Sequence, residues 1–223
     1  MTTTVTTLKT RIADTINRSN LGSLIAGWLE TAHHTINQTK DWQAQEAEAR
    51  FLASAVTYSF TVPTDFKASR PPGLVRTAGV SPTSEVIPTK FYGRRGFTDL
   101  LVQRSEADPS VAHPNLIEDD LEAIWDLDQT SVRIFPKNTT TTDQFVFFYY
   151  KMLPLPADVS SDWFTDNAFD YLLYESLLQG VPALGGNDDR IKSWTSLRDR
   201  ALQRVIGLDI ERRLTGASLM MRG

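Results

Sequence analysis

The spacing of apolar residues changes twice along the chain, and this limits the folds that the chain can adopt. Over residues 8–36 apolar side chains recur every three or four positions, as on one face of a helix. From residue 51 to residue 152 they alternate or run together, which indicates strands. Helical spacing returns after Asp162. This order predicts an α+β fold: a helical bundle formed by the N- and C-terminal helices, an inserted small antiparallel β region and an extended C-terminal arm.

Two helices are predicted at the N-terminus. Thr6 or Thr7 caps the first, and Asn20-Leu21-Gly22 ends it, because Asn and Gly tolerate the left-handed conformation there. Ser23 begins the second helix, which ends before Asp41-Trp42. Helices with a short connection are expected to pack as an antiparallel hairpin.

The middle of the chain reads as strands and loops. A hairpin is predicted between the strand that ends at Leu52 and the alternating residues 56–62, with its turn at 53–55. Shorter strands are predicted at 74–78 and 85–89. The stretch 94–102 is predicted as a short helix and 103–115 as a loop.

A second hairpin gives the clearest strand signal. Residues 122–128 and 131–135 flank the dipeptide Gln129-Thr130, and Pro136 is expected to close the second strand. Residues 144–152 hold a run of aromatic and β-branched side chains, which predicts a strand with both faces covered.

The C-terminal third is predicted to be helical. Asp162 or Thr165 caps one helix that Gly180 and Pro182 stop, and Asn187-Asp188 caps a last long helix. Past Gly207 the helical pattern loosens. The predicted organisation is an N-terminal helix pair over 1–43, a mainly β insertion over 44–156, C-terminal helices over 157–207 and a C-terminal docking arm over 208–223.

Composition excludes several classes of protein. Cys is absent, which excludes disulfides, thiolate zinc sites and cysteine nucleophiles. No apolar run reaches the roughly 20 residues of a membrane-spanning helix, and Met1–Thr7 is unlike a signal peptide, so synthesis in the cytosol is expected. The net charge of −4 argues against a protein that coats nucleic acid.

The charge is unevenly distributed. Residues 190–223 carry eight basic and three acidic side chains, a net charge of +5, and the preceding residues carry −9. A basic terminal segment is typical of a tail that docks on nucleic acid or on an acidic protein surface, and equally of a solvated helix face with a frayed end.

The sequence offers no convincing catalytic or metal site. His33 and His34 are adjacent on a predicted helix, so they point about 100° apart and cannot share a metal. Glu46 and Glu48 lie on one face of a predicted strand, as a glycosidase pair could, although such acids more often form a solvated face. No catalytic residue, metal ligand or cofactor is therefore assigned.

Aromatic and arginine side chains point instead to interfaces. Arg94 and Arg95, flanked by Tyr92 and Phe97, could contact phosphates or bases, or could lie at a protein interface. A DNA-binding protein that uses these arginines and the basic C-terminal segment remains an alternative, although the acidic remainder of the chain opposes it.

Short motifs follow one another along nearly the whole chain in a recognisable order. They are Lys40-Asp41-Trp42, Glu46-Ala47-Glu48, Pro63-Thr64-Asp65-Phe66, the segment Val132–Pro136, Tyr149-Tyr150 followed by Leu153-Pro154-Leu155-Pro156, and Trp163–Asn167 leading into Tyr171–Glu175. In this order they resemble the head-to-tail adaptor proteins of tailed bacteriophages, including the tubular tail protein A type.

The resemblance implies a structural virion protein of the neck, made in the host cytoplasm and without membrane partners or cofactors. It implies a ring, usually twelve-fold, that binds the portal protein above and a tail nozzle or other tail protein below. Double-stranded DNA would pass through this ring without sequence-specific binding, for genome retention and ejection. The alternative is a tail-associated glycan hydrolase that uses Glu46 and Glu48.

Candidate interface residues fall into two groups. The candidates for docking on the portal are Arg198, Arg204, Arg212, Arg213, Leu214, Leu219, Met220 and Met221. The candidates that would face the tail or a neighbouring subunit are Tyr92, Arg94, Arg95 and Phe97.

Overall fold

The computed structural model of the chain has mixed α and β structure, as predicted, and divides into two compact units. It describes residues 3–18, 20–52, 57–77, 88–94, 124–128, 130–138, 144–185 and 187–220. Met1–Gln45 and Leu153–Gly223 make up one unit, called here the helical unit. Glu46–Met152 makes up the other, called here the β unit. The helical unit is therefore built from both ends of the chain.

The first two helices have caps that differ from those predicted. Helix α1 spans Val5–Ile16, and Thr4 caps it by accepting a hydrogen bond from Thr7 N–H, so the prediction of Thr6 or Thr7 as the cap is wrong. Asn17 ends α1 in the left-handed conformation at φ 53°. The predicted mechanism is correct, but a nearer asparagine performs it. Helix α2 spans Gly22–Thr39.

The single helix predicted after Asp162 is three helices. Helix α4 spans Trp163–Asn167, α5 spans Phe169–Gln179 and α6 spans Val181–Leu184. Asp162 does cap α4 by accepting from Thr165 N–H, and the Thr165 hydroxyl accepts from Asp162 N–H, which completes a capping box. The capping box therefore sets the direction in which the chain enters α4, before α5 begins.

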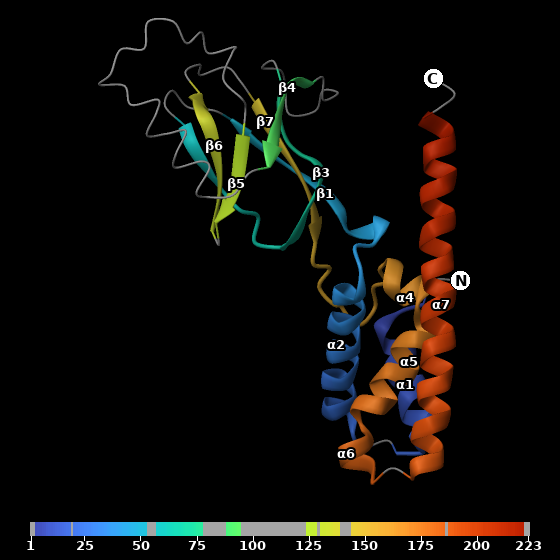
Figure 1. The fold of residues 1–223 in the computed structure, drawn as a ribbon. Helices are drawn as coiled ribbons and strands as arrows, with labels where there is room; N and C mark the ends of the chain where they lie inside the picture. The colour runs from blue at the N-terminus through green and yellow to red at the C-terminus, as the bar shows by residue number, and fades with distance from the viewer. Residues whose placement is uncertain are drawn as a thin grey trace, which may run out of the picture. The chain divides into compact units, whose positions relative to one another are not determined.

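Helix α7 is much longer than predicted. It spans Asp188–Met220, 33 residues, and Asn187 accepts a hydrogen bond from Asp189 N–H at its start. A helix of this length extends about 50 Å. Its C-terminal half extends beyond the other helices of the helical unit (Figure 1). The pattern expected to loosen past Gly207 is therefore continuous helix as far as Met220.

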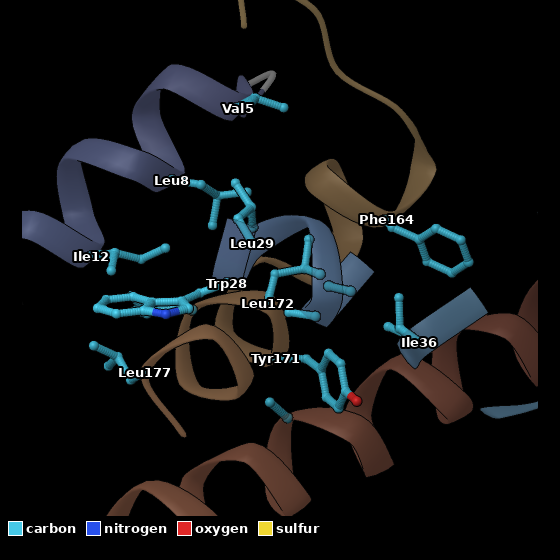
Figure 2. Packing of buried hydrophobic residues seen from close by; sticks show 14 of the residues in the cluster. Val5, Leu8, Ile12, Trp28, Leu29, Ile36, Phe164, Tyr171, Leu172 and Leu177 are labelled. Carbon is cyan, nitrogen blue, oxygen red and sulfur yellow. The ribbon is translucent and has the colours of Figure 1, made fainter. Parts of the chain in front are cut away.

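One hydrophobic core holds the helical unit together. Figure 2 shows side chains of α1, α2, α4 and α5 converging on it, with the Trp28 ring beside Ile12 and Leu177. Helix α7 contributes Ala201 and Val205 to the same core. Each fully buried large apolar side chain contributes about 1.5 to 3 kcal/mol, so this core supplies most of the unit's stability.

The β unit is one seven-stranded sheet in the described part of the chain. Its strands are β1 (Glu46–Leu52), β2 (Thr57–Thr61), β3 (Phe66–Thr77), β4 (Pro88–Arg94), β5 (Ile124–Asp128), β6 (Ser131–Asn138) and β7 (Gln144–Lys151). The strand order is β1-β7-β3-β4-β5-β6-β2. All described pairings are antiparallel except that of β4 with β5.

The predicted hairpin between β1 and β2 is wrong. These strands lie at opposite ends of the strand order, where β1 pairs with β7 and β2 pairs with β6. Phe51 of β1 nevertheless stacks on Phe60 of β2, with ring centroids 4.7 Å apart. The sheet is therefore curled, so that its two ends share one aromatic core.

Other strand predictions hold in part. Strands β5 and β6 form the predicted hairpin, although β6 continues past Pro136 to Asn138. Strand β7 lies between β1 and β3 and is almost entirely buried, as predicted. Arg94 ends β4 and does not start a helix. The rest of the predicted helix at 94–102 and the loop at 103–115 lie outside the described residues.

Candidate functional site

A buried carboxylate fixes the C-terminal half of α7 to the rest of the helical unit. Asp209 is fully buried and accepts hydrogen bonds from Lys40 Nζ at 2.8 Å and from the backbone N–H of Gln43 at 2.8 Å. Arg213, one turn further along α7, donates to Asp209 at 3.2 Å and also to the carbonyl oxygen of Asp41. These contacts hold the helix to the segment that follows α2.

Apolar side chains on this half of α7 face solvent. Ile210 is 48% exposed and Leu214 is 66% exposed, and Leu208 is also exposed. Ile210 and Leu214 are four residues apart, so they lie on one face of the helix. Exposed apolar pairs of this kind are typical of a helix that binds a partner, whereas the exposed Arg212 lies on the opposite face of α7. Leu208 and Ile210 were not predicted, although the i, i+4 spacing from Leu214 could have revealed Ile210.

The predicted docking arginines have different surroundings. Arg198 donates to Asp199 at 2.7 Å and to Glu175 at 3.3 Å. Arg204 lies 3.7 Å from Asp170 and is largely exposed. Arg212 is exposed, whereas Arg213 makes the contacts with Asp209 and Asp41 described above. Arg204 and Arg212 are therefore the more accessible of the four.

The remaining predicted docking residues lie at the end of α7. Leu219 and Met220 belong to its last turn, but their side chains lie outside the described part of the structure. Met221 lies outside the described residues altogether.

The candidates of the β unit separate into core and surface. Tyr92 is only 4% exposed and packs edge-on against Phe145, so it is a core residue and not the exposed interface residue that was predicted. Arg94 is exposed, lies over the Trp125 ring at 5.5 Å and donates to Ser69. Arg95 and Phe97 lie outside the described residues.

The acidic pair considered for glycan hydrolysis is bound to arginines. Glu46 lies 3.0 Å from Arg70, and Glu48 accepts hydrogen bonds from Arg50 at 2.7 and 2.9 Å. These contacts give both carboxylates a structural role on β1. Among the described residues, no group of three His, Asp or Glu side chains could hold a metal ion.

The motifs that carry the resemblance meet in pairs within each unit. In the β unit, Tyr149 donates to Asp65 at 2.9 Å and stacks beside Phe66. Burial and Asp65 together raise the pKa of Tyr149 to about 12. In the helical unit, Trp42 packs against both Trp163 and Phe164. Residues far apart in the sequence thus form two motif contacts, one in each unit.

A comparison with protein families identifies the chain. The model of the SU10 adaptor protein family matches residues 3–222. The chain belongs to this phage adaptor family. No curated protein gives a significant match.

The family confirms the predicted resemblance to phage head-to-tail adaptors. The adaptor is a structural protein that joins the phage head to its tail, and its place is in the virion. None of the adaptor's described helices combines the length and the hydropathy that crossing a bilayer requires.

Acid should weaken the adaptor's helical unit through its buried carboxylates. Burial alone would raise the pKa of Asp209, but the hydrogen bond from Lys40, the Gln43 N–H and the charge of Arg213 outweigh it and lower that pKa. Burial likewise opposes the hydrogen bonds from His33 and Thr165 that lower the pKa of Asp162. Both groups therefore stabilise the fold above their unfolded pKa of about 3.9, and this contribution is lost as pH falls through the folded pKa.

Asp209→Asn tests this pH dependence. The variant should unfold at lower urea concentration than the wild type at pH 7. The difference should shrink at pH 3, below the unfolded pKa of about 3.9, because the unfolded wild-type chain then binds a proton at Asp209 that the folded chain resists. Circular dichroism during urea unfolding at both pH values measures it. Asp199→Asn is the control, because this surface pair with Arg198 contributes only about 0 to 1 kcal/mol. An equal deficit at both pH values would contradict the prediction.

Proposed function

We propose that the adaptor assembles as a ring of twelve subunits beneath the portal vertex, binds a tail protein below and continues the DNA channel. In this position it retains the packaged genome and lets it pass during ejection. The family match over residues 3–222 is the observation that carries this proposal. A net charge of −4 favours passage of DNA without tight binding, because like charges repel.

The portal-binding element is the exposed part of α7 from Leu208 to Met220. Ile210 and Leu214 are exposed on one face of this helix, and Leu208 and Arg212 are exposed on the opposite face. A helix with an exposed apolar pair fits an apolar groove on the partner, in which Ile210 and Leu214 would be the anchors. The helix is already formed, so binding need not order it.

The tail-facing element is the exposed side of the β unit near β4. Phe91 is 62% exposed, and Arg94 is held in place over Trp125. Aromatic and arginine side chains held in this way are enriched at the centres of protein interfaces. Glycan hydrolysis is not favoured, because Glu46 and Glu48 are each engaged by an arginine.

Leu214→Asp tests the portal contact. A charge on the binding face of α7 should weaken binding to the portal protein about tenfold or more, because buried interface anchors contribute about 2 kcal/mol or more. The fold should be unchanged, since Leu214 is 66% exposed. Surface plasmon resonance with immobilised portal protein measures the affinity.

The matched control is Leu24→Asp. Leu24 is an exposed leucine near the start of α2, so the same substitution is made on a different helix of the same unit. It should leave portal binding within about twofold of the wild type. Removing residues 216–223 should also abolish binding, while it leaves the Asp209 and Arg213 contacts in place. Wild-type affinity in both Leu214→Asp and the truncated chain would refute this portal contact.

A further inference from the structure

The segment Lys40–Gln45, which leads from α2 to β1, is held along its length by buried groups. It includes the short 3₁₀ helix η1, Gln43–Gln45, which contacts α7. We call Lys40–Gln45 the crossing segment, because it leaves the helical unit where the β unit begins at Glu46. Its contacts connect it on one side to α7 and on the other to α2.

On the α7 side, one carboxylate carries the connection. Asp209 Oδ2 accepts from Lys40 Nζ and Asp209 Oδ1 accepts from Gln43 N–H, each at 2.8 Å. Arg213 adds a hydrogen bond to the carbonyl oxygen of Asp41. Three of the six residues of the crossing segment are thus bound directly to the C-terminal half of α7.

On the α2 side, a buried amide carries the connection. Asn37 is fully buried, and its Oδ1 accepts from Gln45 Nε2 at 2.9 Å and from Leu153 N–H at 3.0 Å. Its Nδ2 donates to the Leu153 carbonyl oxygen at 3.2 Å. The Asn37 side chain therefore binds both the residue before the β unit, Gln45, and the residue after it, Leu153.

Between these two anchors the crossing segment is closely packed and hydrogen-bonded. Trp42 is fully buried, donates from Nε1 to the Ile36 carbonyl oxygen at 2.7 Å and packs against Trp163 and Phe164. The backbone N–H of Trp42 donates to Gln45 Oε1 at 3.1 Å. A closely packed segment of this kind transmits strain, because protein interiors have low compressibility.

We propose that the crossing segment couples the C-terminal half of α7 to both chain connections of the β unit, with Asp209 and Asn37 as its two anchors. A displacement of α7 would move Lys40 and Gln43 through their hydrogen bonds to Asp209. The hydrogen bond between Gln45 and Asn37 would then transmit the displacement to Asn37 and Leu153. The portal as the cause of such a displacement rests on the function proposed above. The coupling itself is a property of the free chain.

Hydrogen exchange of the full-length chain, without portal protein, tests the coupling. Asp209→Asn removes the charge that three donors share and should speed backbone exchange at least tenfold at residues 40–45, at Leu153 and in α7 beyond Gly207. Exchange in α7 from Ile191 to Arg200 should not change. Asp199→Asn, a surface carboxylate of the same helix, is the control and should alter neither region.

Acceleration confined to α7, with residues 40–45 and Leu153 unchanged, would overturn the proposal. If Asp209→Asn unfolds the chain, Lys40→Met decides the question, because it removes only one of the donors and keeps the carboxylate with its two others. Lys40→Met should then speed exchange beyond Gly207 of α7, and an unchanged α7 would overturn the coupling. Failure of portal binding would refute the proposed function and leave these exchange results standing.

Discussion

Asn37→Ala is expected to lower the free energy of unfolding of the helical unit by about 3 kcal/mol or more. The substitution leaves the N–H and carbonyl groups of Leu153 without the Asn37 side chain, and the Gln45 amide keeps only its hydrogen bond to the carbonyl oxygen of residue 37. Each buried polar group left unsatisfied costs about 1 to 3 kcal/mol, and the lost groups add together here. Urea unfolding followed by circular dichroism at 222 nm measures the change.

Asn167→Ala is the matched control for this prediction. Asn167 is exposed at the end of α4, and its described hydrogen bond goes to the Trp163 carbonyl oxygen. Its loss should cost less than about 1 kcal/mol, because water replaces the amide. Similar losses in both variants would show that Asn37 has no special role at the chain connections.

Gly73→Ala is expected to destabilise the β unit by about 2 to 4 kcal/mol. Gly73 has φ +83°, where a side chain costs about 1 to 2 kcal/mol. An added Cβ would lie 2.8 Å from Cζ2 of Trp125, which is buried in the sheet core. Overpacking of this kind costs a further 1 to 3 kcal/mol or so. Thermal unfolding followed by near-ultraviolet circular dichroism, which reports on Trp125 among the aromatic residues, measures the effect.

The opposite sign is expected for Gly27→Ala, which serves as the control. Gly27 lies in the middle of α2, and an added Cβ there would meet nothing within 4 Å. Alanine is favoured over glycine inside a helix by about 1 kcal/mol, so this variant should be slightly more stable than the wild type. Equal effects of the two substitutions would contradict the close approach of Gly73 to Trp125.

The helix pattern could be predicted from the sequence where one face is apolar and the ends have distinctive chemistry. Asp162 and Asn187 were among the residues predicted as caps, together with Thr165 and Asp188, because each stands just before an apolar helical pattern. The cap of α1 could not be chosen, because Thr4, Thr6 and Thr7 have the same chemistry. Only the position of Val5 in the core distinguishes them.

Strand pairing could not be predicted from neighbours in the sequence. A short connection between β1 and β2 favoured a hairpin, but the aromatic residues of β7 provide a better partner for β1. Phe51 and Phe60 meet only because the sheet curls, which is a property of all seven strands together.

The exposed apolar surface of α7, which we propose as the docking surface, could be predicted in part. The basic charge and apolar residues after residue 207 pointed to the C-terminal half of α7, but Gly207 suggested that the helix ended there. Asp209 and Arg213 bind the part of α7 after Gly207 to residues 40–43. No local sequence pattern predicts this tertiary contact. The same contact shows why Arg213 has a structural role, while Ile210 and Leu214 are left exposed.

The mass of the assembled protein is the most direct test of the adaptor account. Native mass spectrometry of the full-length chain, alone and mixed with the portal protein of the same phage, would give the number of subunits in each complex. The account predicts a complex with the portal that contains a closed ring of adaptor subunits, twelve in the form proposed here. Chains that stay monomeric beside intact portal rings at micromolar concentration would contradict it.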